Sequence, residues 1–141
     1  MTDQNIIKSE KAPEPVGAYS HARKEGNLLF LAGMGPRKKG SKEIPGVTLD
    51  TTGKIIDYDI EKQTLSVFEN IKTVLEESGT KWENILDVTV FLTNMDDDFE
   101  KFNKLWAQHF PDPDNLPTRT TVEVNKLPTP IAVELKVIAK I

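Results

Sequence analysis

The sequence contains no cysteine, and this absence excludes several kinds of site at once. A chain without thiols has no disulfides, no thiolate ligands for a metal and no cysteine nucleophile. Its two histidines are isolated from each other, which does not match the clustered ligands of a zinc site. We therefore expect no metal site.

The sequence also lacks long apolar runs and a surplus of basic residues. No stretch approaches the roughly 18 apolar residues that span a membrane. The first ten residues, MTDQNIIKSE, have neither the basic start nor the apolar segment of a signal peptide. The net charge of −4 does not favour binding to a phosphate backbone. We expect a soluble cytoplasmic protein, with neither a membrane nor a nucleic acid as its partner.

What is present is the composition of an ordinary globular domain. The 141 residues, of which 38% are hydrophobic and 28% charged, can bury roughly two-thirds of the unfolded surface. No internal repeat or low-complexity tract divides the chain. Residues 1–141 are therefore predicted to form a single domain.

The most regular pattern lies in residues 116–140, where two runs alternate between apolar and polar side chains. Such alternation is typical of half-buried strands. Pro128 and Pro130 separate the runs and favour a turn, because neither can donate a hydrogen bond to a sheet. We predict a hairpin, with Arg119 at the start of its polar face.

Strands are also predicted before the first helix. Residues 1–17 are typical of a partly extended arm, whereas residues 18–24 and 28–34 flank the turn sequence Glu25-Gly26-Asn27 and predict a hairpin. The connection over residues 35–57 lacks strong periodicity. A connection of this length is either mobile or covers a site.

Two segments have the spacing of amphipathic helices. The first begins at the capping residue Asp59 and stops at Gly79. A strand over residues 85–93 follows, and the second helix is capped by residues 96–98 and ends before Pro111. The inward-facing residues of the second helix are predicted to be Phe99, Phe102, Leu105, Trp106 and Phe110.

The predicted order is β-β-α-β-α-β-β, which gives an α+β layer with one mixed sheet and two helices on one face. The other face of the sheet stays uncovered, although some of its outward positions, including Ala132 and Ile138, are apolar. We therefore expect the chain to form an oligomer through that face.

The chain resembles the Rid family, also called YjgF-type, in five segments that occur in order: GAYSHA, LLFLAGMGP, NILDVTVFLTNMDDDFEKFN, PTRTTVEVNKLP and VELKVIA. Members of this family have carried the labels L-PSP endoribonuclease and translation inhibitor. The resemblance covers residues 10–141, and PTRTTVEV with the following LP is its most specific part. One departure is an additional aspartate in NMDDDFEKFN.

The resemblance implies a chorismate-mutase-like fold and a homotrimer whose sheets face a central barrel, with the sites in clefts between subunits. It also implies the hydrolysis of small 2-imino and 2-enamino carboxylates to 2-keto acids and ammonia, without metal or cofactor. The implied trimer agrees with the expectation of an uncovered apolar face.

Arg119 matches the family arginine that holds the substrate carboxylate, a task for which a guanidinium fork is well suited. The alternative is a solvated arginine paired with Glu123. Glu134 matches an acidic residue that helps to activate or orient the hydrolytic water, and half-burial would raise its pKa. The alternative there is a polar strand position or an interface salt bridge. In the predicted hairpin Glu134 lies opposite Glu123, about 13 Å from Arg119 at strand rise, so the two could share a substrate only across an interface.

Five further residues match positions that line the family cleft. Tyr19 belongs to the G-x-Y motif, with interface packing as its alternative role, and Asn103 either lies near the site or caps a loop. Ala32 and Gly33 stand where the family brings backbone close to the ligand. Thr121 replaces a cysteine that many relatives carry, which keeps hydrogen bonding but not thiol chemistry.

Two features remain open at the level of sequence. His21 is either a base or, more commonly for such a position, an exposed strand histidine. The segments GAYSHARKEG and GMGPRKKG resemble the 2-aminomuconate deaminase-like branch of the family. Arg37, Lys38 and Lys39 would then meet a second carboxylate, or else form a solvated basic loop.

The leading hypothesis is a cofactor-independent imine and enamine deaminase in which Arg119 and Glu134 are catalytic. A dicarboxylate enamine is an alternative substrate. Two other classes of function compete with it: a non-catalytic module that binds small carboxylates, and a ribonuclease or translation inhibitor. The acidic net charge opposes the last of these.

Overall fold

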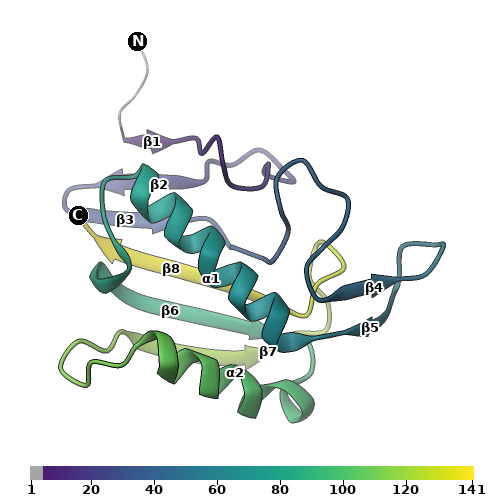
Figure 1. The fold of residues 1–141 in the computed structure, drawn as a ribbon. Coiled ribbons are helices and arrows are strands. Elements are labelled where there is room, and N and C mark those ends of the chain that lie inside the picture. Colours follow the sequence, from purple (N-terminus) through teal and green to yellow (C-terminus); the bar gives the residue numbers. More distant parts are fainter. Residues whose placement is uncertain (1–4) are drawn as a thin grey trace.

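The structure is a computed structural model that describes residues 5–141. Its main sheet consists of β1 (Ile6–Ile7), β2 (Ala22–Glu25), β3 (Leu28–Leu31), β6 (Ile85–Leu92), β7 (Thr118–Glu123) and β8 (Val133–Lys140). The strands lie in the order β1-β2-β3-β8-β6-β7, and every pair is antiparallel except β6 and β7. Figure 1 shows α1 (Ile60–Glu77) and α2 (Met95–His109) over one face of this sheet. The predicted mixed sheet with two helices on one face is confirmed.

Both helices begin at a capping side chain. The Asp59 carboxylate accepts hydrogen bonds from two backbone N–H groups of the first turn of α1, and Gly79, with a φ of +83°, follows the end of that helix. In α2 the cap is Asn94, which accepts from the N–H of Asp97. The prediction of a cap at residues 96–98 was therefore wrong. These carboxylates lie in the first turn, where the helix dipole favours negative charge.

The core lies between the helices and the covered face of the sheet. Its centre is β8, in which every second residue is at most 1% exposed: Val133, Leu135, Val137 and Ala139. Phe68 of α1 and Phe102 of α2 join the same cluster, with ring centroids 6.3 Å apart. Phe99 was wrongly predicted to point inward; it is 36% exposed, because it lies beside the outer strand β7. A 3-10 helix, η1 (Trp82–Asn84), leads from α1 into β6.

The predicted hairpin over residues 116–140 was wrong, although both of its strands exist. β6 lies between β7 and β8 and pairs with both. The intervening segment passes across the end of β6, where Val124 N donates to Leu92 O and Thr93 N donates to Ala132 O. Alternation identifies a strand and its two faces, but it does not identify the neighbouring strand.

The connection over residues 35–57 contains a second hairpin that the sequence did not reveal, formed by β4 (Val47–Leu49) and β5 (Ile55–Tyr58). Its turn depends on Asp50, whose carboxylate accepts from the N–H groups of Thr52 and Lys54, and on Gly53 at a φ of +85°. The two strands are too short for an alternating pattern to stand out. In Figure 1 the hairpin projects beside the start of α1.

The N-terminal strands are shorter than expected. β2 begins at Ala22 rather than at residue 18, because the chain before it turns, with Tyr19 N donating to Gly17 O and Val16 N donating to the Tyr19 hydroxyl. Of the predicted extended arm, residues 1–4 lie outside the described residues, and β1 pairs with β2.

The face of the sheet away from the helices carries apolar side chains. Phe30 and Ile138 are register partners on this face, and Val122 lies beside Phe91 farther along. Val122 is 36% exposed and the other three are partly exposed. Ala132, which was expected here, is instead fully buried, at 0% exposure.

Candidate functional site

The two proposed catalytic residues lie on opposite faces of the sheet. Arg119 on β7 is the register partner of Val88, which is 1% exposed and faces the helices. Glu134 on β8 is the register partner of Phe91, which faces the other way, because side chains alternate along a strand. The covered face therefore holds the arginine, and the uncovered face holds the carboxylate.

Arg119 and Glu134 are also separated within the sheet. Val88 pairs with Arg119 on one side and with Val137 on the other, and Glu134 lies farther along β8 from Val137. Strand spacing and rise place the two Cα atoms about 14 Å apart. The two side chains cannot contact one small substrate within one chain, as expected from the sequence. The pairing assumed for that estimate was wrong, since Glu134 lies opposite Phe91 and not opposite Glu123.

Arg119 lies between the sheet and two aromatic rings of α2. Its guanidinium carbon is 4.9 Å from the ring centroid of Trp106 and 5.8 Å from that of Phe99. Burial lowers the pKa of Arg119. Within residues 5–141 the guanidinium has no ion pair or hydrogen bond, and Glu123, its proposed partner, instead accepts from Met95 N at 2.8 Å. Arg119 is thus a cation held in place by rings and left available to an anion.

Thr121 points to the same face as Arg119. It is the register partner of the buried Val90, and its hydroxyl oxygen is itself buried without a hydrogen-bond partner in the described part of the chain. A buried polar atom without a partner is unfavourable by about 1–3 kcal/mol, so a water, an ion or a ligand group that bonds to it is stabilising. Asn103 is exposed and shares the side of α2 that carries Phe99, four residues earlier. These residues form the first group of the candidate site.

Glu134 is half-buried and lies against Gly33. A Cβ added at Gly33 would be 2.8 Å from Oε2 of Glu134, so the absence of a side chain at this glycine gives the carboxylate its room. Burial raises the pKa of Glu134, and the charge of Arg37 partly offsets that effect. A carboxylate with a raised pKa suits proton transfer to and from water.

Tyr19 and Ala32 border a small pocket together with Gly33 and Arg37. The Tyr19 hydroxyl accepts a hydrogen bond from Val16 N at 3.1 Å, and its side chain is 47% exposed. The backbone N–H of Ala32 donates to His21 O at 2.9 Å. Tyr19, Ala32, Gly33 and Glu134 form the second group of the candidate site.

Arg37 is a residue of this pocket that the sequence alone did not separate from its neighbours. Lys38 pairs with Glu69 at 3.1 Å, and Lys39 pairs with Glu14 at 3.3 Å. Arg37 instead donates one hydrogen bond to a backbone oxygen, Glu14 O, at 2.9 Å. Arg37 makes no ion pair with a carboxylate of residues 5–141. Of these three basic residues, it is therefore the one that lines the pocket and whose charge is not paired.

His21 is not an exposed strand histidine. It is 6% exposed and directly precedes β2. Both ring nitrogens have backbone partners, so this residue is not free to act as a base on a substrate.

A wide groove of about 1070 Å³ lies elsewhere, between the β4–β5 hairpin and the start of α2, and contains none of the predicted site residues. There the Tyr58 hydroxyl donates to the buried Asp98 carboxylate at 2.7 Å. No three His, Asp or Glu residues in the described ranges are placed to hold a metal ion. Likewise, none of the helices in residues 5–141 is both long and apolar enough to cross a membrane.

Comparison with known proteins identifies relatives along nearly the whole chain. The family model described as endoribonuclease L-PSP matches residues 9–141. A RutC family protein of Pyrococcus abyssi is 39% identical over 137 residues, which cover 96% of each chain. The chloroplastic Reactive Intermediate Deaminase A of Arabidopsis thaliana is 32% identical over 136 residues, 96% of this chain and 65% of that one.

The fold is shared with solved structures. The Escherichia coli protein TdcF, solved with bound serine, superposes with a TM-score of 0.80 at 28% identity, and the match covers 96% of this chain and 98% of that one. Structural similarity to such proteins over nearly the whole chain confirms the expected chorismate-mutase-like fold.

The raised pKa of Glu134 predicts a dependence of stability on pH. The folded protein holds the Glu134 proton more tightly than the unfolded chain does, so this group stabilises the fold at low pH, and that contribution is lost as the pH rises through the folded pKa. Glu134→Gln removes the buried charge. It should therefore be more stable than wild type at neutral pH, with the difference vanishing as the pH falls to about 4.

Thermal denaturation of both proteins at pH 7.5 and pH 4 measures this difference. Glu25→Gln, at an exposed position of β2, is the matched control and should change stability little at either pH. A Glu134→Gln protein that is no more stable than wild type at pH 7.5 would contradict the claim that the buried charge of Glu134 destabilises the fold.

Proposed function

The chain belongs to the endoribonuclease L-PSP family, whose members also carry the names RutC and Reactive Intermediate Deaminase. We propose that this member of the family is an imine deaminase. Its substrates are small 2-imino or 2-enamino carboxylates, which it hydrolyses to 2-keto acids and ammonia. The observation that carries this proposal is the free guanidinium of Arg119 beside the unpartnered hydroxyl of Thr121.

Arg119 and Thr121 bind the substrate carboxylate. The guanidinium offers several N–H donors in one plane, and the rings of Phe99 and Trp106 limit its motion. The hydroxyl of Thr121 supplies a further donor from the same face of β7. Partial burial strengthens the attraction for an anion, because water competes less for both charges. The bound serine of TdcF, itself an amino acid, is consistent with a carboxylate site in this fold.

Glu134 acts on the hydrolytic water. The substrate enters as an imine, or as an enamine that tautomerises to one. Water attacks the imine carbon while the Glu134 carboxylate accepts a proton from it. The imine nitrogen, protonated before the attack, becomes the amino group of the tetrahedral intermediate. Glu134 returns its proton to that nitrogen, the hydroxyl proton of the intermediate is lost to solvent as the C=O bond forms, and the C–N bond breaks to release ammonia and a 2-keto acid. Tyr19 and the backbone at Gly33 shape the space around the reacting carbon, and the reaction requires no cofactor.

Because the two groups lie on opposite faces of one sheet, a complete site requires two chains. We infer a homotrimer in which the Arg119 group of one subunit meets the Glu134 group of the next. The partly exposed apolar side chains of the uncovered sheet face support association, since burying them releases water. A closed ring repeats the same interface three times.

Arg119→Ala tests the central part of this proposal. Loss of the carboxylate anchor should lower kcat/KM for imine hydrolysis by about 100-fold or more, because a charge-assisted pair in a partly buried site is worth several kcal/mol. Ammonia and keto-acid release are measured with an imine generated in the assay by an amino-acid oxidase. Lys54→Ala, at an exposed position in the turn of the β4–β5 hairpin, is the control for loss of one positive charge.

Undiminished turnover by Arg119→Ala would refute the proposed role of Arg119. If the wild type binds 2-oxobutyrate but accelerates the hydrolysis of no imine, the chain is a carboxylate-binding module instead.

A dicarboxylate enamine is a second candidate substrate, and the position of Arg37 favours it. Arg37 lines the pocket next to Glu134 and makes no ion pair with a described carboxylate, whereas Lys38 and Lys39 do. A second carboxylate on the substrate would satisfy this cation. The unpaired charge of Arg37 would thus favour substrates with two carboxylates over substrates with one.

Arg37→Ala should lower kcat/KM about tenfold more for a dicarboxylate enamine than for a monocarboxylate imine, because only the former loses an ion pair there, whereas loss of the Arg37 hydrogen bond to Glu14 O affects both substrates alike. Lys38→Ala is the matched control, since it removes a neighbouring charge that is paired with Glu69. An equal effect of Arg37→Ala on both substrates would contradict selection by Arg37.

A further inference from the structure

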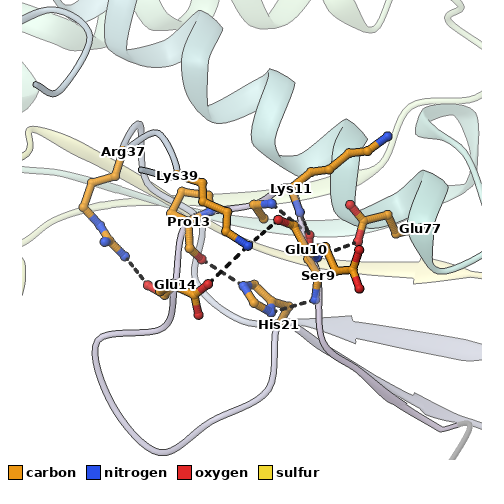
Figure 2. A network of polar contacts seen from close by, with 10 residues as sticks. Ser9, Glu10, Lys11, Pro13, Glu14, His21, Arg37, Lys39 and Glu77 are labelled. Atoms are coloured by element: carbon orange, nitrogen blue, oxygen red, sulfur yellow. Dashed lines mark hydrogen bonds and ion pairs between the residues drawn. The ribbon is translucent and has the colours of Figure 1, made fainter. Parts of the chain in front are cut away.

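We propose that His21 is a positioning residue that locks an N-terminal strap, residues 9–19, into place as one wall of the small pocket at Gly33, beside Glu134. The inference deepens the proposed function, because its activity readout rests on imine hydrolysis at that site. Figure 2 shows the residues that carry it.

His21 is held by two hydrogen bonds of opposite kind. Ser9 N donates to Nδ1 at 2.9 Å, and Nε2 donates to Pro13 O at 2.8 Å. A backbone N–H can only donate and a carbonyl can only accept, so the ring is neutral, with its hydrogen on Nε2. With the side chain only 6% exposed, water cannot readily replace either bond.

The two bonds pin both ends of one turn of the strap. Within that turn, Ala12 N donates to the Ser9 hydroxyl at 2.9 Å. Beyond it, Glu14 O accepts from Arg37, next to the Pro13 carbonyl that His21 holds. His21 and Arg37 therefore hold two consecutive carbonyl groups of the strap, and a shift at one of them moves the other.

The loop on the far side of the strap has its own support. Asn70 of α1 donates to Gly35 O at 2.9 Å and to Arg37 O at 2.7 Å, and Ser66 donates to Pro36 O at 2.7 Å. The backbone at Arg37 thus stays in place when the strap moves. Apart from Ala12, which is buried in the core cluster, the other contacts of the strap are mostly exposed, such as Lys39 with Glu14 and Glu10 N with Glu77, and exposed contacts of this kind contribute little.

The strap contributes directly to the pocket. The strap supplies Pro13, Glu14, Pro15 and Tyr19 to its lining, to which His21 itself, Ala32 and Gly33 also belong. The backbone oxygen of His21 accepts from Ala32 N, so the same residue connects the strap to the strand end that faces Glu134. Release of the strap would free Tyr19 and leave Arg37 without its backbone acceptor, while Glu134 keeps its place on β8. Substrate binding would weaken more than the chemical step.

Three variants at His21 separate its two bonds. His21→Ala removes both, His21→Asn keeps an acceptor near the position of Nδ1, and His21→Gln keeps a donor near the position of Nε2. His21→Ala should raise KM for imine hydrolysis by about tenfold, as expected for two lost hydrogen bonds, with kcat within about twofold. The Asn and Gln variants should each recover part of the loss. Lys54→Ala, at an exposed position in the turn of the β4–β5 hairpin, is the control and should leave KM unchanged.

Hydrogen–deuterium exchange of the intact protein tests the strap without reference to catalysis. In His21→Ala the amides of Ser9 and Ala12 should exchange about tenfold faster, while amides of β8 should not change. If His21→Ala does not fold, His21→Gln takes its place, with faster exchange expected at Ser9 alone.

Two results would overturn the proposal: unchanged exchange of the strap amides, or faster exchange without a rise in KM. Should the wild type hydrolyse no imine, the proposed function fails by itself. Titration of wild type and His21→Ala with 2-oxobutyrate then replaces KM, with about tenfold weaker binding by the variant supporting the lock and equal affinity overturning it.

Discussion

The position of β6 between β7 and β8 is the constraint on which the candidate site depends. Its register assigns Arg119 to the face covered by helices and Glu134 to the uncovered face. Side chains alternate strictly along a strand, so no rotation of either side chain brings the two together. A reaction that uses both residues therefore needs a second copy of the chain. The apolar positions left on the uncovered face are consistent with such association.

Partial burial of unpaired charge gives each half of the site its chemistry. Arg119 and Glu134 each lose water on folding. Burial therefore lowers the pKa of Arg119 and raises that of Glu134, which favours the neutral form of each. A charge that is desolvated without a partner costs free energy, and a bound ligand of opposite charge recovers part of that cost. Arg119 with the hydroxyl of Thr121 thus favours an anion, and Glu134 favours a proton. If Arg119 or Glu134 were fully exposed, water would compete for its charge, and the binding of an anion or a proton would be weaker.

Much of the fold followed from periodicity. The capping residue Asp59, the stop at Gly79 and the strand at residues 85–93 agree with the structure, because each depends on local geometry. The pairing of strands could not be predicted in the same way, because an alternating run shows which faces a strand has but not which strand lies beside it. The sequence therefore predicted that β7 pairs with β8, whereas β7 pairs with β6. The β4–β5 hairpin was missed because its strands are so short.

The site was foreseen unevenly. The resemblance carried by PTRTTVEV singled out Arg119, and the separation from Glu134 was expected, although it was estimated from the wrong pairing. The burial of His21 was not foreseen, because its two partners lie in a strap with no regular secondary structure. Nor did the sequence distinguish Arg37 from Lys38 and Lys39, since their difference lies in which carboxylates the loop brings near them.

Subunit mixing tests most directly whether the site is shared between chains. Arg119→Ala and Glu134→Gln, each nearly inactive alone, would be unfolded together at equal amounts, refolded and assayed for imine hydrolysis. In a ring with one Arg119 and one Glu134 from adjacent subunits at each site, random assembly restores both native residues at about one quarter of the sites, so activity should recover to about a quarter of wild type. Activity that stays at the level of the separate variants, in mixtures shown to contain mixed oligomers, would contradict a shared site.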